Sequence, residues 1–215
     1  MDEFSGNEVR AATPFATLRK FTRRRAPLER CELCSKELVE GHDHLLERST
    51  RQILCACEPC AILFSGHENL RYLRVPRRPR VLTDFLMTDL EWEALMLPIN
   101  LAFFYRDGAG DGIIAMYPSP AGATESLLSL ESWAEIVRCN PKLQSMEADV
   151  EALLVNRMGT ARDYFLVPID ECYRLVGLIR VHWRGLSGGN EVWKQMREFF
   201  SHLKRRCGHP EAIGA

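Results

Sequence analysis

Two pairs of cysteines in the first third of the chain have the spacing of metal ligands. Cys31 and Cys34 form one C-x-x-C pair, and Cys57 and Cys60 form the second. Two thiolates three positions apart in a tight turn can reach one ion, and two such turns complete a tetrahedron. Because four thiolates donate enough charge to make the ion a poor Lewis acid, the pattern predicts a metal with a structural role rather than a catalytic one.

Zinc is the metal that this donor set predicts, and iron is the alternative. Both ions accept four sulfur ligands. Rubredoxin-like iron sites use similar paired cysteines but usually carry glycine directly after each pair, where this chain has Ser35 and Ala61. The sequence therefore favours zinc over a rubredoxin-like iron module for electron transfer.

A fifth cysteine leaves the choice of ligands open. Cys55 lies two positions before Cys57, and the two side chains point to the same side if a strand continues through both. Cys55 can then replace Cys57 as a ligand. We favour Cys57 because it pairs with Cys60 at the spacing of a tight turn.

Two histidines between the cysteine pairs are further alternative ligands. His42 and His44 lie where the first strand of a hairpin is expected. A histidine on this strand resembles the one that activates water in HNH nucleases. Those enzymes also need an asparagine or histidine on the following helix, where this chain has Ala61 and Ile62. We therefore expect the histidines to cap the hairpin or to hydrogen-bond to a thiolate.

The residues between and after the cysteine pairs predict a treble clef, a zinc-ribbon-like module. Residues 45–47 and 52–55 flank a polar turn and predict a hairpin, while Pro59 stands where a helix begins and Gly66 where it ends. A knuckle, a hairpin and a helix with two ligands at its start make up this arrangement. The helix N-terminus also favours thiolates.

The remainder of the chain predicts an α+β domain with a β-hairpin and several helices. Residues 99–105 and 113–117 read as the hairpin, and residues 118–126 read as a polar loop. Pro141 opens a predicted helix whose apolar face includes residues 146, 150, 153 and 154. We expect four regions: a basic arm (1–27), the four-cysteine metal module (28–66), the α+β domain (67–207) and a tail (208–215).

Composition and charge narrow the classes of function. The chain has 215 residues, of which 46% are hydrophobic, and its formal net charge is −1. That balance supports a packed core and gives no overall attraction to nucleic acid or membranes. No apolar run reaches the roughly 20 residues that span a bilayer. We expect a cytoplasmic protein whose eight cysteines remain thiols or bind metal.

Several polar residues in the second part of the chain are candidates for a ligand or cofactor site. They lie beside apolar stretches, where either a buried ion network or a binding cleft can form. No Ser/His/Asp order and no catalytic Cys/His pair stands out, so we name no catalytic residue and lean away from an enzyme. The candidates are Glu125, Arg157, Asp170, Tyr173 and Arg184.

Four strings in the second two thirds carry a family resemblance. Together with the cysteine module, they resemble a bacterial family of unknown function that is associated with gene clusters for oxygen-tolerant, actinobacterial-type nickel–iron hydrogenases. The resemblance spans roughly residues 28–205 and implies an accessory or maturation role, with a hydrogenase subunit or maturation factor as the protein partner. It implies no catalytic residues. The strings are residues 117–126, 149–157, 164–170 and 183–189.

The sequence therefore predicts an accessory or interaction protein of a hydrogenase system with a structural zinc site. One alternative is an enzyme with a cleft in the C-terminal domain, and another is the rubredoxin-like iron module. The last is an HNH-like nuclease or a nucleic-acid binder that uses the arginines of residues 23–25 and 71–80.

Overall fold

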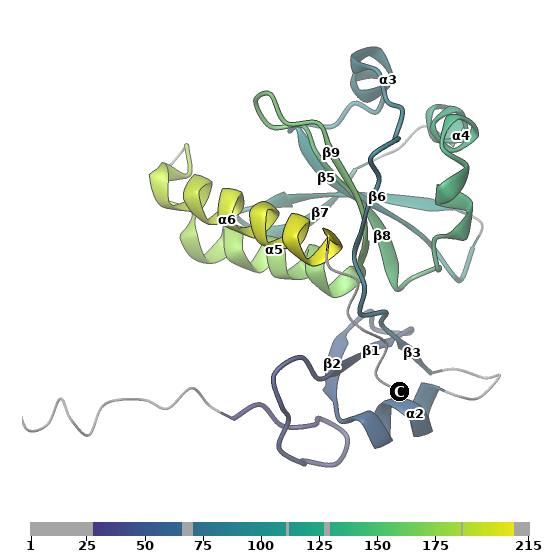
Figure 1. Ribbon diagram of the computed structural model, residues 1–215, viewed down its shortest axis with the longest axis vertical. Helices are drawn as coiled ribbons and strands as arrows, with labels where there is room; N and C mark the ends of the chain where they lie inside the picture. The colour runs from purple at the N-terminus through teal and green to yellow at the C-terminus, as the bar shows by residue number, and fades with distance from the viewer. Residues whose placement is uncertain (1–27, 66–70, 111, 127–129, 186, 209–215) are drawn as a thin grey trace, which may run out of the picture.

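The computed structural model describes residues 28–65, 71–110, 112–126, 130–185 and 187–208. The predicted basic arm and nearly all of the predicted tail lie outside the described residues. Figure 1 shows a small lower body, which holds the N-terminal strands, and a larger upper body built on a second sheet. The predicted α+β class is confirmed.

The lower body is a three-stranded antiparallel sheet with one helix. β1 (Asp43–Glu47) and β2 (Ile53–Ala56) form the predicted hairpin, and α2 (Glu58–Ser65) is the predicted helix. β3 (Tyr72–Arg74) pairs with the other edge of β1, which gives the order β2-β1-β3. This third strand lies beyond residue 66, the predicted end of the module.

The upper sheet has six antiparallel strands in the order β4-β9-β8-β5-β6-β7. A meander of three strands and a hairpin of two meet where β5 pairs with β8. The short β4 closes one edge against β9. The strands are β4 (Arg80–Val81), β5 (Leu101–Arg106), β6 (Ile113–Ser119), β7 (Gly122–Ser126), β8 (Glu151–Asn156) and β9 (Asp163–Pro168).

Helices cover both faces of the upper sheet (Figure 1). α5 (Ile169–His182) and α6 (Gly189–Gly208) pack together on one face. α3 (Asp89–Ala94) and α4 (Leu130–Cys139) contribute to the apolar layer on the other. The sheet is therefore the middle layer of three, and its central strands are buried on both sides.

The prediction of a helix that begins at Pro141 and continues to residue 154 is wrong. Pro141–Ser145 forms only a short 3-10 helix, and β8 begins a few residues later. In β8, Ala152 and Leu154 face α5 and α6, whereas Leu153 and Val155 face the opposite layer. A strand that is buried on both faces is apolar at consecutive positions. Its apolar residues therefore also fit the spacing of one helix face, which led to the prediction of a helix.

The polar loop predicted at residues 118–126 is a hairpin instead. β6 continues to Ser119, the chain turns at Pro120 and Ala121, and β7 begins at Gly122. The Ser119 hydroxyl donates to the Gly122 carbonyl over 3.0 Å and lies 3.2 Å from the Thr124 hydroxyl. The polar side chains of this segment stabilise the turn.

The two bodies share part of one core. Leu46 of β1 and Val75 after β3 are buried among the residues under α5 and α6. Arg51, in the turn between β1 and β2, pairs with Asp107 at 2.7 Å and with the buried Asp149 at 3.1 Å. The small body is therefore packed against the large one and not tethered by the chain alone.

Candidate metal centre

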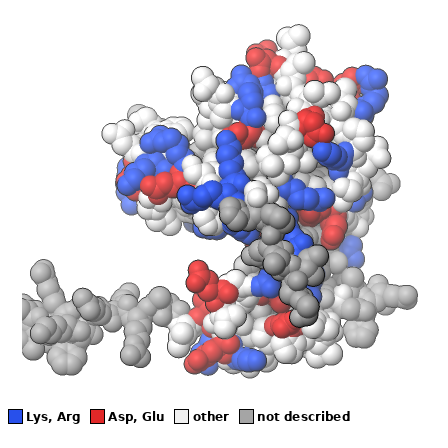
Figure 2. Space-filling model, in the orientation of Figure 1, with Lys and Arg blue, Asp and Glu red and all other residues white. Residues whose placement is uncertain are grey.

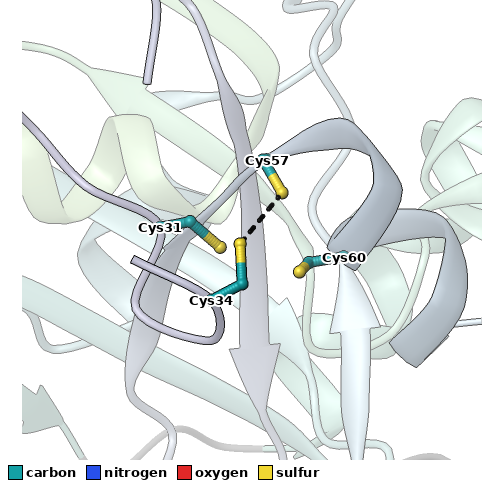
Figure 3. Close-up of side chains that lie close together, drawn as sticks. All are labelled: Cys31, Cys34, Cys57 and Cys60. Atoms are coloured by element: carbon teal, nitrogen blue, oxygen red, sulfur yellow. Dashed lines mark hydrogen bonds between the residues drawn. The ribbon is translucent and has the colours of Figure 1, made fainter. Parts of the chain in front are cut away.

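Four cysteines of the lower body point toward one another (Figure 3). The sulfur atoms of Cys31, Cys34, Cys57 and Cys60 all lie within 4.8 Å of one another, and the Cys34 and Cys57 sulfurs are 3.6 Å apart. A tetrahedral ion with metal–sulfur bonds of about 2.3 Å separates its ligands by about 3.8 Å. The cluster has the size that one tetrahedral ion needs, so the four thiols can bind a metal.

Two local structures place the sulfurs. The first pair lies in a tight knuckle, where the Ser35 N–H donates to the Cys31 carbonyl over 2.7 Å and Ser35 has a φ of 63°. The second pair lies at the start of α2, where the Ala61 N–H donates to the Cys57 carbonyl over 2.9 Å. The cluster and the fold around it are compatible with the small metal module that the sequence predicts.

The pKa values of Cys31 and Cys60 are shifted in opposite directions within this cluster. Burial alone would raise the pKa of Cys31, but the backbone groups of Cys57, Leu33 and Cys34 hold it down to about 6. Burial and the neighbouring sulfurs raise the pKa of Cys60 far above its usual value. The negative charge of one thiolate thus disfavours ionisation of the next thiol. A divalent cation at the centre would offset this repulsion and let all four ionise together.

The fifth cysteine lies on a different side of the hairpin. β2 ends at Ala56 and α2 begins at Glu58, so no strand continues from Cys55 through Cys57. Cys55 pairs in register with His44 instead, and its sulfur is grouped with His42 and His44. The geometry favours Cys57 in the four-cysteine set, and that ligand assignment stays a prediction.

The two histidines lie at the junction of the bodies. His44 Nδ1 is 2.6 Å from an Asp170 carboxylate oxygen at the start of α5, and this hydrogen bond raises the pKa of His44. His42 Nδ1 lies 3.1 Å from the Val39 carbonyl. Neither histidine belongs to the four-cysteine group. α2 has Ala61 and Ile62 at the positions where an HNH nuclease has an asparagine or histidine, so this helix lacks the second catalytic residue of such a site.

The sequence indicates His42, His44 and Cys55 as three separate alternative ligands and does not predict that they form one group. The signal was present in the hairpin register. A turn centred between residues 49 and 50 pairs Leu46 with Ile53 and therefore His44 with Cys55. The contact with Asp170 spans 126 positions of sequence, and no local pattern indicates it.

The remaining candidates are dispersed through the upper body. Asp170 and Tyr173 line one cavity, whereas the buried Arg157 lines another. Arg184 follows the far end of α5, which is roughly 20 Å long at about 1.5 Å per residue, and donates to the Val181 and Trp183 carbonyls. Glu125 lies on the edge strand β7. Asp170 and Arg184 therefore lie at opposite ends of α5, so the two side chains do not share one site.

Four arginines of residues 71–80 pair with carboxylates of the protein. Arg71 pairs with Glu47 at 2.6 Å, and Arg80 pairs with the buried Glu151 at 3.0 Å. Arg74 and Arg77 both approach Asp43, at 3.0 and 3.8 Å. Figure 2 shows side chains of both signs interspersed over the face in view. The charges of these four arginines are therefore compensated by neighbouring carboxylates.

The comparisons with known proteins give one match. A family model described as a family of unknown function, DUF5947, matches residues 30–207. No curated protein and no solved structure matches the chain. In the part of the chain that the structure describes, the helices are all too short or too polar to cross a membrane.

Proposed function

The chain belongs to this family of unknown function, DUF5947, and from that membership and the cysteine cluster we propose that it is an accessory or interaction protein with a structural metal ion. The ion is zinc, bound by Cys31, Cys34, Cys57 and Cys60. The observation that carries the proposal is the closed cluster itself. Four thiolates at tetrahedral spacing leave no coordination position for a substrate or an activated water.

A metal ion would supply stability that the lower body lacks. Its own apolar cluster buries three cysteines, two alanines and one large side chain, Leu45, while Leu33, Leu38 and Tyr72 are only partly buried against it. Domains of about 40 residues usually need a metal, a disulfide or a partner to fold. The four cysteines are free thiols close enough to bind one ion, so metal binding is one such source.

We propose that α2 forms part of the surface that meets the partner. Three consecutive apolar residues of this helix are exposed: Ile62 by 59%, Leu63 by 61% and Phe64 by 41%. Apolar side chains gathered on a surface are typical of a protein interface. The resemblance of the sequence to the hydrogenase-associated family suggests a hydrogenase subunit or maturation factor as the partner.

Capture of partners from the native host tests this proposal. The full-length protein, tagged and expressed at its natural level, should recover a hydrogenase subunit or maturation factor. A Leu63→Asp substitution should reduce the recovery by about 30-fold, the loss expected when a charge replaces an apolar anchor worth about 2 kcal/mol. The matched control is Leu90→Asp on α3, because Leu90 is 78% exposed and lies on the other body.

The control variant should recover the partner as the parent does, and both variants should keep their metal. Equal recovery by Leu63→Asp would contradict the role of α2. Recovery of a partner outside the hydrogenase system would support the interaction role but contradict the assignment of this protein to that system. A strain that lacks the protein but has normal hydrogenase, together with no reproducible partner, would reject the accessory role altogether.

A further inference from the structure

We propose that His42, His44 and Cys55 form a second metal site, distinct from the four-cysteine cluster, that binds a divalent transition ion such as Zn²⁺ and keeps one coordination position open. One ligand atom from each residue lies within 4.8 Å of the other two. Two imidazoles and one thiolate are a donor set that zinc accepts. This inference does not rest on the accessory role proposed above.

The hairpin separates the two sets of ligands. Residues opposite each other in an antiparallel pair lie on one face of the sheet, so His44 and Cys55 share a face. Leu46, two positions along, is buried in the core of the upper body, whereas Leu45 packs in the cysteine cluster. The second set therefore faces the upper body, on the opposite side of β1 and β2 from the four cysteines.

Each histidine is held through one ring nitrogen, which leaves the other for a metal. The Nδ1 atom of His44 is engaged by Asp170 and that of His42 by the Val39 carbonyl. Metal-bound histidines are commonly oriented in this way by a carboxylate or a backbone carbonyl. The His42 side chain is only 8% exposed, and its buried Nε2 atom has no hydrogen-bond partner.

An unpaired polar atom in a buried position costs free energy unless a ligand satisfies it. The His42 Nε2 atom is such a position, and a metal ion bound there would complete its bonding. Two carboxylates add a negative field that favours a cation. Asp170 holds His44, and a Glu29 oxygen lies 3.5 Å from His42 Nδ1.

The open position faces a cavity of about 830 Å³ between the two bodies. His42 and His44 line it from the hairpin, while Tyr173 of α5 and His202 of α6 line it from the opposite side. Figure 2 shows the surface hollowed where the lower body meets the upper one. Among the residues that the structure describes, the group has three donors, and three protein ligands with an exchangeable fourth position characterise reactive zinc sites.

Metal stoichiometry tests the second site. Full-length protein loaded with Zn²⁺ and dialysed should bind a second equivalent beyond the four-cysteine ion, and a zinc chelator should remove the second equivalent faster. The His42→Ala and Cys55→Ser variants should each lose the second equivalent and keep the first. An Asp170→Asn variant should bind the second equivalent about 10- to 100-fold more weakly, because Asp170 is a positioning residue for His44.

Cobalt substitution identifies the ligands independently. Co²⁺ in the second site should give a spectrum of mixed nitrogen and sulfur ligation that disappears in His42→Ala, while the four-thiolate spectrum persists. That persistence also shows that the variant is folded. Cys207→Ser, which changes a cysteine outside every group of possible metal ligands among the described residues, should behave like the parent. A single equivalent in the parent protein, unchanged in His42→Ala and Cys55→Ser, would overturn the proposal.

Discussion

Replacement of Cys60 by serine is expected to release the structural metal ion and unfold the lower body. Cys60 is one of four sulfurs that lie within 4.8 Å of one another, and its side chain is almost fully buried. A hydroxyl does not replace a thiolate as a zinc ligand at neutral pH. Structural zinc contributes about 10–16 kcal/mol in zinc-finger peptides, more than the small apolar cluster around Leu45 can replace.

The upper body should remain folded in this variant, with reduced stability. Its sheet and four helices bury two apolar layers of their own, one on each face. The lower body contributes Leu46 and Val75 to one layer, so their loss lowers the free energy of unfolding without removing the core. We therefore expect the chain to become sensitive to protease at residues 28–75, while β5 to α6 stays protected.

Elemental analysis and limited proteolysis measure the two effects. The four-cysteine ion should be lost, together with any ion at His42, His44 and Cys55, because both groups lie in the lower body. A protected fragment that contains the upper body should accumulate. Cys207→Ser is the control, because Cys207 lies near the end of α6 and belongs to none of the groups of possible metal ligands among the described residues. A Cys60→Ser protein that keeps both its metal content and its protease resistance would contradict the assignment. A parent protein that is red and contains iron would change the assignment of the metal from zinc to iron.

The parts of the fold that the sequence predicted correctly are those with local causes. The hairpin of β1 and β2 is set by a polar turn between apolar strands. The capping box that begins α3 has an equally local cause, because the Thr88 hydroxyl accepts the Glu91 N–H and the Glu91 carboxylate accepts the Thr88 N–H. The two C-x-x-C knuckles likewise need only neighbouring residues. Such signals lie within a few positions and require no knowledge of the tertiary structure.

The parts that could not be predicted depend on distant neighbours. β8 is apolar at consecutive positions because helices cover both faces of its sheet, a fact that its own residues do not contain. Asp170 was an isolated candidate until the fold placed it against His44. The same applies to Arg157, whose partners on α3 lie nearly seventy positions earlier in the chain. Sequence reasoning can identify such residues as unusual but cannot assign their partners.

Replacement of Arg157 by methionine is expected to destabilise the upper body by about 2–4 kcal/mol, because the buried Tyr164 hydroxyl and the partly buried Met87 carbonyl lose a charged donor. Arg157 is 3% exposed and pairs with Asp89. It also donates to the Tyr164 hydroxyl over 2.5 Å and to the Met87 carbonyl over 3.2 Å, and it lies over the Trp92 ring. Methionine fills similar volume but satisfies none of these polar groups.

Arg162 provides the matched comparison for this variant. It also contacts Asp89, at 3.3 Å, but its side chain is 46% exposed, so solvent screens the pair and replaces it when it is lost. Arg162→Met should therefore change the free energy of unfolding by less than about 0.5 kcal/mol in urea titrations. If Arg157→Met were equally harmless, the arginine would not be a structural residue, and its place beside the cavity lined by Asp89 and Tyr164 would indicate ligand binding instead. A large difference between the two variants would establish that burial, rather than the shared carboxylate, determines the contribution of Arg157.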